Sequence, residues 1–284
     1  MIISKDWKDY ELIDTSSGEK LERWGDIILR RPDPQIVWNT PMGKEWNKVD
    51  GWYHRSNKGG GSWEFFTNVP ETWSISYKKL KFIIKPMNFK HTGLFPEQAV
   101  NWEWMINKIQ NANRPIRVLN LFAYTGGATV ACSYAGASVC HVDASKRIVA
   151  QAKENLTLSG LGNREVRFIV DDVGKFVERE IRRGKKYDAI VMDPPSYGKG
   201  SNGEVWDIEK DLYPLILKTL DILSDNPLFY LINSYTAGLA PSVLDNILKL
   251  SMKNGKTSCG EIGLPITRQN IVLPCGIFGR WSDD

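Results

Sequence analysis

The sequence is poor in residues that bind metals or form disulfides. Its 284 residues include three histidines and four cysteines, and no two cysteines form a C-x-x-C pair. We therefore expect neither a zinc site nor a disulfide framework. No apolar run approaches the roughly 18 residues of a membrane helix, and the first residues lack the apolar stretch of a signal peptide. These absences predict a cytoplasmic protein.

The charge balance excludes two classes of protein and leaves the partner open. The chain has 37 Lys and Arg against 33 Asp and Glu, a net charge of +4, and 42% of its residues are hydrophobic. Such a chain can bury a core, which excludes an intrinsically disordered or a collagen-like protein. The length allows one large domain or two smaller ones.

The tryptophans divide the chain into two regions, because nine of the eleven precede residue 105. Up to about residue 85, short apolar or aromatic runs alternate with turn sequences such as DTSSGE and RRPDPQ. This pattern predicts a small β-rich domain over residues 1–88, with WSISYKKLKFIIKP as its clearest hairpin. Residues 89–284 then form a second domain.

The second domain alternates strands with amphipathic helices. The predicted strands lie near 116–122, 138–142, 165–170, 187–192 and 228–234, and the predicted helices begin near Gly126, Ser145, Val173, Asp207 and Pro241. This alternation predicts an α/β, Rossmann-like, mostly parallel sheet with helices on both faces. Two further runs, 257–264 and 271–278, predict a terminal antiparallel hairpin.

Three successive strand ends carry residues suited to one ligand. Gly126 and Gly127 follow the first strand, where the backbone can approach a ligand closely, although such a turn can also bind nothing. Asp143 ends the second strand and suits the two hydroxyls of a ribose or the cap of the next helix. Asp172 follows the third strand and can accept a hydrogen bond from an adenine amine. The G-x-G-x-x-G fingerprint is absent, which favours a nucleoside without phosphates over NAD(P).

The fourth strand ends in the sequence VMDPPSYGKG. Two prolines after Asp193 prevent the backbone from forming a helix, so that carbonyl groups face the crevice. Asp193 and the Pro194 carbonyl can accept hydrogen bonds from a planar substrate, and Tyr197 can stack on it. Asp-Pro-Pro is also a good strand terminator, but the carboxyl end of a central parallel strand is where open α/β sheets bind ligands.

Together, the motifs HTGLFPEQ, NLFAYTGG, HVDAS, VDDVGKF and VMDPPSYGKG resemble those of class I S-adenosylmethionine-dependent methyltransferases. They are most similar to the large-subunit ribosomal RNA base methyltransferases of the RlmI/RlmK kind, over about residues 75–280. The resemblance implies the methyltransferase fold, S-adenosyl-L-methionine as cofactor, and Asp193, Pro194 and Tyr197 as the catalytic, methyl-accepting site. It implies that the cofactor is bound by Gln98, Phe122, Ala123, Tyr124, Thr125, Gly126, Gly127, Asp143, Ala144, Ser145, Asp172, Val173 and Asp193.

The chain departs from some of these relatives at the reacting residues. Enzymes that make 5-methylcytosine need a cysteine nucleophile. Where the resemblance places that cysteine, after the fifth strand, this chain has Asn233, Ser234 and Tyr235, and Ser196 follows Asp-Pro-Pro. Cys275 is more simply interpreted as a buried thiol. Ala99 replaces an arginine of the relatives. Direct in-line displacement on a nitrogen is the simplest remaining mechanism.

The substrate is less well defined than the cofactor. Nine basic residues stand against four acidic ones between Lys44 and Lys90, interleaved with aromatic residues. This composition favours a platform for single-stranded RNA, but it also fits a lysine-rich surface over a tryptophan core. The Trp-rich segment could equally contact a second subunit, so a homodimer stays open. The basic residues are Lys44, Lys48, Arg55, Lys58, Lys78, Lys79, Lys81, Lys85 and Lys90.

Three hypotheses on function remain. The first is methylation of a nitrogen in an RNA base, with ribosomal RNA or its precursor as partner. The second is methylation of a small molecule or a protein, since the chain is too short for the separate RNA-binding domain that many of the related enzymes carry. The third is a non-catalytic nucleic-acid-binding protein on the same scaffold. An oxidoreductase ranks below all three.

Overall fold

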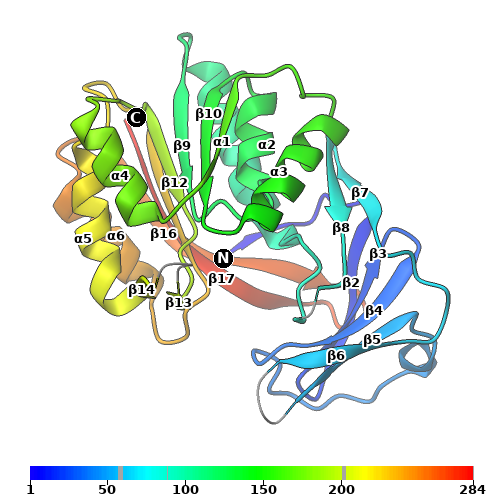
Figure 1. The fold of residues 1–284 in the computed structure, drawn as a ribbon. Coiled ribbons are helices and arrows are strands. Elements are labelled where there is room, and N and C mark those ends of the chain that lie inside the picture. The colour runs from blue at the N-terminus through cyan, green and yellow to red at the C-terminus, as the bar shows by residue number, and fades with distance from the viewer. Residues whose placement is uncertain (57–59, 88, 200–202, 284) are drawn as a thin grey trace. The chain divides into compact units, whose positions relative to one another are not determined.

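The computed structural model describes residues 1–56, 60–87, 89–199 and 203–283 (Figure 1). The chain divides into two compact units. The first comprises Met1–Ala99 and Gly263–Cys275, and the second comprises Val100–Ile262 and Gly276–Asp284. The segment 263–275, which the sequence analysis placed in the second domain, thus belongs to the first unit. Lys58, one of the basic residues noted above, lies outside the described residues.

Helices cover both faces of the sheet in the second unit (Figure 1). The helices on one face are α1 (Ala99–Asn111), α2 (Gly127–Tyr134) and α3 (Lys146–Leu158), and those on the other are α4 (Val173–Arg182), α5 (Ile208–Leu220) and α6 (Pro241–Ser251). Its strands are β9 (Arg117–Leu121), β10 (Ser138–Asp143), β11 (Val166–Val170), β12 (Ala189–Met192), β15 (Phe229–Ser234), β16 (Lys256–Ile266) and β17 (Ile271–Ser282). The predicted alternation of strands and helices is confirmed.

The strand order in this unit is β11-β10-β9-β12-β15-β17-β16. Neighbouring strands from β11 to β15 pair in parallel, and β17 pairs antiparallel with β15. The predicted parallel sheet and its antiparallel terminal strand are therefore present. The chain moves outward from β9 to β11 and then returns to the other side of β9 with β12. That reversal makes a topological switch point, where open α/β sheets bind ligands at the carboxyl ends of the strands.

The first unit is rich in β-strands, as the turn-rich sequence predicts. The sheet order β16-β2-β3-β4-β5-β6 joins β2 (Tyr10–Ser16), β3 (Glu19–Trp24), β4 (Ile27–Pro32), β5 (Gly51–Arg55) and β6 (Gly61–Phe65) to β16. The remaining elements are β1 (Ile2–Ile3), the hairpin of β7 (Trp73–Tyr77) and β8 (Leu80–Ile84), and the 3-10 helices η1 (Lys44–Asn47) and η2 (Pro96–Gln98). Most strand pairs of this unit are antiparallel, whereas β4 pairs with β5 and β16 with β2 in parallel. The predicted hairpin in WSISYKKLKFIIKP is β7–β8.

Long-range pairing explains why the tail segment belongs to the first unit. Ile266 of β16 pairs in parallel with Leu12 of β2, and the Arg268 amide donates to the Ile13 carbonyl at 3.0 Å. Strand β16 therefore begins in the second unit and ends in the first, whereas β17 begins in the first unit and ends in the second. A local sequence pattern gives no sign of such a partner, because the paired residues lie more than 250 positions apart.

A buried ion pair stabilises the first unit. Glu22 is fully buried, and its carboxylate accepts hydrogen bonds from Arg31 Nε at 2.6 Å and from the Tyr10 hydroxyl at 2.8 Å. Lys20 Nζ lies 3.7 Å from the same carboxylate. Burial alone would raise the pKa of Glu22, but the charges of Arg31 and Lys20 outweigh it and lower this pKa to about 2.

We expect Glu22→Gln to lower the free energy of unfolding by about 3–5 kcal/mol at neutral pH, because it leaves the Arg31 guanidinium buried without its counter-charge. Because the pKa of Glu22 is lowered from 4.5 to about 2, its stabilising effect is present above pH 4.5 and disappears as the pH falls towards 2. Urea unfolding across this pH range measures both effects. In the control Glu11→Gln, which breaks a half-exposed pair with Arg23, the loss should stay below about 1 kcal/mol. Equal losses in the two variants would contradict this role for Glu22.

Candidate active site

The turn after β9 has an unusual backbone. Phe122, Tyr124 and Gly126 all have positive φ, at 53°, 49° and 83°. The first two are not glycine, so this conformation persists only where the surroundings hold it. The Ala123 amide donates to the Val142 carbonyl at 3.1 Å, and Asn155 Nδ2 donates to the Thr125 carbonyl at 2.8 Å. The turn is thus held rigidly open at the carboxyl end of β9.

The two glycines of this turn are required by close packing. A Cβ on Gly126 would lie 2.9 Å from the Ala152 Cβ of α3, and one on Gly127 would lie 2.8 Å from Trp102 Cζ2 of α1. Neither position therefore accepts a side chain without a shift of its neighbours. Gly126 is also the N-cap of α2, so the helix N-terminus begins directly at the turn.

Asp143 connects the ends of β9 and β10. Its carboxylate accepts hydrogen bonds from the Tyr124 amide and from the Ser145 amide, both at 2.9 Å. Burial raises the pKa of Asp143, while these two backbone hydrogen bonds lower it, and the net shift is upward. Each carboxylate oxygen can accept a second hydrogen bond. Asp143 therefore fixes the turn and the start of α3 and still has acceptor capacity for a ligand.

The end of β11 lies beside the end of β10. The Asp171 amide donates to the Asp143 carbonyl at 3.1 Å, and Asp172 is the N-cap of α4, where its Oδ1 accepts from the Lys175 amide at 2.9 Å. Asp172 thus has a helix-capping role of its own, and Val173 beside it is buried. The three predicted strand ends meet at one edge of the sheet.

The segment after β12 forms a compact loop and hairpin. Asp193 follows Met192, and its amide donates to the Leu121 carbonyl of β9 at 3.4 Å. The Trp206 indole Nε1 donates to the Pro195 carbonyl at 2.6 Å, and the Ile208 amide donates to the Ser196 carbonyl at 3.1 Å. Short strands β13 (Tyr197–Lys199) and β14 (Val205–Asp207) pair antiparallel. Tyr197 is 58% exposed, so its ring is accessible.

Trp206 links the two halves of the site. Besides the hydrogen bond to Pro195, its ring packs against the Phe122 ring at 4.8 Å between centroids. One side chain therefore supports both the strained turn after β9 and the loop after β12. The sequence analysis did not select Trp206, although it is one of only two tryptophans beyond residue 104.

Comparison with known proteins identifies the family of this chain. Residues 38–237 match the family described as S-adenosylmethionine-dependent methyltransferase. The chain belongs to this family. It is similar to a solved S-adenosylmethionine-dependent methyltransferase from Agrobacterium tumefaciens, with 36% identity, a TM-score of 0.95, and coverage of 100% of this chain and 93% of the other.

Two curated relatives of the methyltransferase are named for ribosomal RNA. It is 28% identical over 193 residues to ribosomal RNA large subunit methyltransferase K of Neisseria meningitidis, covering 67% of this chain and 52% of the relative. It is 33% identical over 148 residues to methyltransferase K/L of Shewanella frigidimarina, covering 51% and 20%. The chain therefore spans about half the length of the first relative and about a fifth of the length of the second.

The residues at the sheet edge fit S-adenosylmethionine, the cofactor of the family. The backbone of the turn from Phe122 to Gly127 lies at the carboxyl end of β9, where such sheets bind ligands, and the half-buried Asp143 carboxylate offers acceptors for the two hydroxyls of a ribose. Gln98, which the sequence also predicts to contact the cofactor, ends η2 in the first unit, whereas the other predicted residues belong to the second. All of these cofactor contacts stay predictions.

Cys140 and Cys275 are poorly suited to nucleophilic catalysis. Burial raises the pKa of the Cys140 thiol to about 11, and burial and Glu97 raise the pKa of Cys275. Where the related 5-methylcytosine enzymes carry their cysteine, Asn233 is buried and accepts a hydrogen bond from Asn101 Nδ2 at 2.8 Å. These raised pKa values keep both the Cys140 and the Cys275 thiol protonated at neutral pH, so neither of these two is suited to act as a nucleophile.

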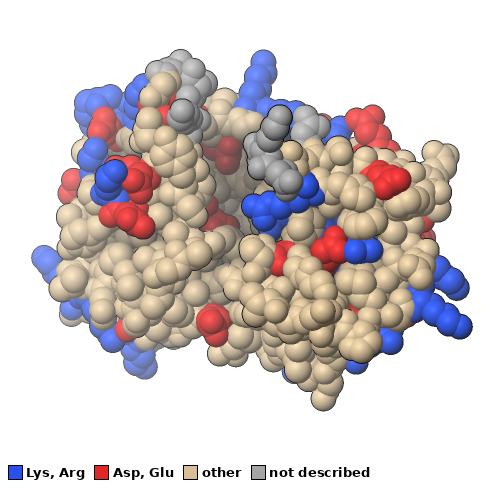
Figure 2. All heavy atoms as spheres, turned by 90° about the horizontal axis from the view of Figure 1, so that it is seen from below, with Lys and Arg blue, Asp and Glu red and all other residues tan. Residues whose placement is uncertain are grey.

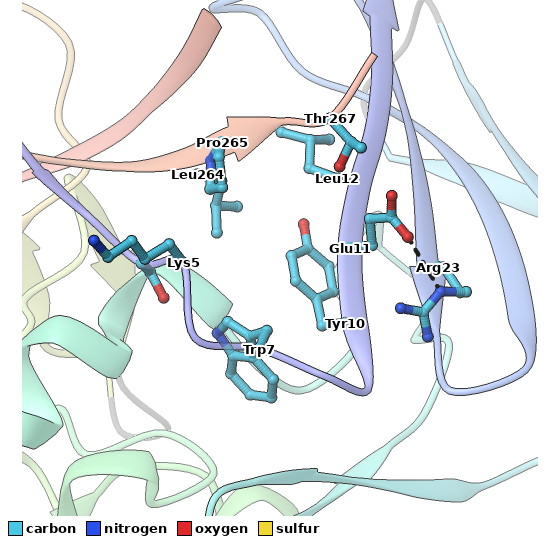
Figure 3. A pocket seen from close by; sticks show the side chains of 10 residues that line it. Lys5, Trp7, Tyr10, Glu11, Leu12, Arg23, Leu264, Pro265 and Thr267 are labelled. Carbon is cyan, nitrogen blue, oxygen red and sulfur yellow. Dashed lines mark hydrogen bonds and ion pairs between the residues drawn. The ribbon is translucent and has the colours of Figure 1, made fainter. Parts of the chain in front are cut away.

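A separate cavity of about 210 Å³ lies in the first unit, between β2, β16 and the segment that precedes β2 (Figure 3). Figure 3 shows Trp7 and Tyr10 on one side of it and Arg23 paired with Glu11 on the other. Arg23 also donates to the carbonyls of Gly25 and Lys8 at 3.0 and 3.1 Å. Two of the three charged residues that line this cavity, Arg23 and Glu11, are therefore bonded within the protein, and we assign no ligand to it.

Among the described residues, no group of three or more His, Cys, Asp or Glu is placed to hold a metal ion. Within the same residues, no helix is both long enough and apolar enough to cross a membrane.

Proposed function

We propose that this methyltransferase transfers the methyl group of S-adenosylmethionine to a nitrogen atom of an RNA base, with ribosomal RNA or its precursor as substrate. The observation that carries the proposal is the pattern of carbonyl groups after β12. The Pro195 carbonyl accepts a hydrogen bond from the Trp206 indole, and the Ser196 carbonyl accepts one from the Ile208 amide. Within the described residues, no hydrogen bond reaches the Pro194 carbonyl. The Pro194 carbonyl thus offers an acceptor at the switch point beside the Asp193 carboxylate, whose two oxygens can accept several hydrogen bonds, and the amino group of a base is a donor that such acceptors can bind.

In the mechanism that follows, the protein acts by positioning the accepting nitrogen. Bound S-adenosylmethionine supplies a methyl group activated by a sulfonium leaving group, so no strong base is required. Asp193 and the Pro194 carbonyl orient the nitrogen by accepting its hydrogen bonds, and the carboxylate stabilises the positive charge that develops there. Tyr197 is exposed on β13, which supports its proposed role of stacking on the base. The raised pKa values of Cys140 and Cys275 speak against a covalent intermediate at carbon.

RNA is favoured as the substrate by two features. Both curated relatives described above are named as ribosomal RNA methyltransferases. The segment from Lys44 to Lys90 carries nine basic and four acidic residues, and a basic surface is what phosphate groups bind. Because the chain spans only part of these relatives, the RNA substrate stays a proposal for this protein.

A labelling experiment tests the proposed function. The purified chain is incubated with S-adenosylmethionine carrying a tritiated methyl group and with total RNA from a strain that lacks the gene. We expect tritium in the RNA, and mass spectrometry of digested nucleosides should find a base methylated on nitrogen. Label that enters only protein or small molecules would contradict the RNA assignment. A 5-methylcytosine product would contradict the mechanism.

We expect Trp206→Phe to lower kcat about tenfold and to leave the cofactor Kd unchanged. The phenylalanine keeps the ring contact with Phe122 but cannot donate to the Pro195 carbonyl, so the acceptor loop loses its fixed position. Trp206→Ala removes both contacts and should also weaken cofactor binding. Steady-state kinetics together with calorimetry separate the two effects. Equal kcat values for Trp206→Phe and the wild type would exclude a positioning role.

A further inference from the structure

The β5–β6 hairpin of the first unit presents a row of side chains on one face. Tyr53 pairs with Trp63, Gly51 with Phe65, and Arg55 with Gly61. Because successive strand residues point to opposite faces, these residues share one face. The Trp63 and Phe65 rings are stacked within 4° of parallel, with centroids 5.8 Å apart. Phe65 is 47% exposed although it is large and apolar.

The two rings are held in place by their neighbours. A Cβ on Gly51 would lie 3.0 Å from two atoms of the Phe65 ring, so the glycine lets this ring lie close against β5. The Trp63 indole donates to the Met87 carbonyl at 2.8 Å, and the Tyr53 ring contacts Trp63 edge-on at 5.4 Å. The rings form a preorganised surface, so a ligand that stacks on them has little ordering to impose.

Two basic residues, Arg55 and Lys90, belong to the segments that hold these rings: Arg55 shares their face of the hairpin, and Lys90 follows Met87, to which Trp63 donates. The loop that begins at Met87 contains Lys90, whose carbonyl accepts from Arg31 Nη1 at 2.7 Å. Among the described residues, neither Lys90 nor Arg55 forms an ion pair. Burial lowers the pKa of Lys90, and the charges of Lys20, Arg31 and Arg55 lower it further, although Asp33 opposes them. Burial is the largest cause of this shift, so an anion bound beside Lys90 would stabilise the charged form that burial disfavours.

We propose that Arg55, Lys90, Trp63 and Phe65 form a binding site for single-stranded RNA, which we call the stacking platform. The rings would stack on bases and the two cations would contact phosphates, the combination that single-stranded nucleic acids require. The proposal rests on the proposed function, because it concerns how the same RNA substrate is held. Figure 2 shows basic and acidic side chains interspersed on one face of the molecule, without a broad field of one sign there. A local site that combines rings with cations suits such a surface.

A second copy of the chain is a less suitable occupant. β6 is the last strand in the sheet order, so its edge could pair with another β6. A two-fold pairing of this kind presents the same surface on both sides of the interface, and would gather two sets of uncompensated cations there. Repulsion between like charges opposes that arrangement, whereas an RNA chain supplies the opposite charge.

The test measures the affinity of the full chain for a fluorescein-labelled single-stranded RNA of about 12 nucleotides, within the site size of such surfaces. Fluorescence anisotropy is recorded at several salt concentrations. Phe65→Ser should weaken binding about 5- to 100-fold at every salt concentration, because it removes stacking only. Arg55→Glu should weaken binding and also reduce the slope of log affinity against log salt by about 0.7 or more, the value for one phosphate contact.

Matched controls separate this site from a general effect of charge or stability. Lys8→Glu makes the same change of charge at an exposed position before β2, outside the basic segment from Lys44 to Lys90, and Val37→Ser removes an exposed apolar side chain in the same unit. Both controls should bind RNA like the wild type. All four variants should bind S-adenosylmethionine normally by calorimetry, which shows that the second unit is intact.

Three outcomes would overturn the platform. The first is wild-type RNA affinity in both Phe65→Ser and Arg55→Glu. The second is equal weakening in the controls. The third is a dimer in sedimentation that Phe65→Ser converts to a monomer, which would assign the surface to a second copy. If RNA is methylated and these variants bind it normally, only the platform fails. If the wild type neither binds nor methylates RNA, the proposed function itself fails.

Discussion

Asp193→Ala should lower kcat for methyl transfer by about 10²–10³-fold, the largest loss that we expect from a single side chain at the acceptor loop. Asp193 directly follows β12 at the switch point, beside the end of β9, to which its amide donates. The carboxylate is expected to orient the accepting nitrogen and to stabilise the charge that develops on it, and removing one such preorganised group has an effect of this size. Single-turnover methylation with saturating cofactor measures the loss.

A second substitution at Asp193 and a control at a distant residue make this test more specific. Asp193→Asn keeps one acceptor oxygen but no charge, so its activity should lie between those of the wild type and Asp193→Ala. Asp225→Ala removes an exposed carboxylate far along the chain and should leave kcat unchanged. If Asp193→Ala is folded and fully active, the acceptor site must lie elsewhere.

Asp143→Ala should raise the Kd for S-adenosylmethionine at least about 100-fold. The substitution removes the predicted acceptors for the ribose and also the hydrogen bonds that hold the Tyr124 and Ser145 amides. Two hydrogen bonds to a charged group contribute about 1.5–3 kcal/mol each, which corresponds to this loss. Titration calorimetry with the cofactor and with its demethylated product measures it.

Glu165→Ala provides the matched control for Asp143. Glu165 immediately precedes β11 and accepts a hydrogen bond from Ser138, the first residue of β10, so it lies at the amino ends of the strands. Its removal should leave the cofactor Kd unchanged. Equal affinities in Asp143→Ala and the wild type would show that the cofactor is not held at the carboxyl end of β10.

The alternating pattern of the second unit could be predicted because its signals are local. A buried strand, a turn and an amphipathic helix each follow from neighbouring residues, and the helix starts at Pro241 and Val173 agree with the structure. The hairpin of β13 and β14 was not predicted, because its strands are three residues long and depend on the contact between Trp206 and Pro195. Contacts of this kind leave no periodic pattern.

In the candidate site, too, some residues could be predicted from the sequence and others could not. Asp143, Asp172 and Asp193 could be selected because each follows a recognisable strand. The residues that shape the turn around Gly126 could not be selected in this way, because they lie on other elements: Trp102 on α1 and Asn155 on α3. Their contribution depends on close packing across the fold. The ion pair of Glu22 with Arg31 was likewise not foreseen, since burial decides whether two charges form a structural pair.

A crystal structure of the chain with S-adenosylhomocysteine tests most directly the claim that the carboxyl edge of this sheet holds the cofactor. The expected result is one molecule per chain, with its ribose hydroxyls bonded to Asp143 and its amino-acid part against the backbone from Phe122 to Gly127. Its adenine should lie beside Asp172. Density for the ligand at any other place, or no binding at concentrations that saturate related enzymes, would contradict that claim.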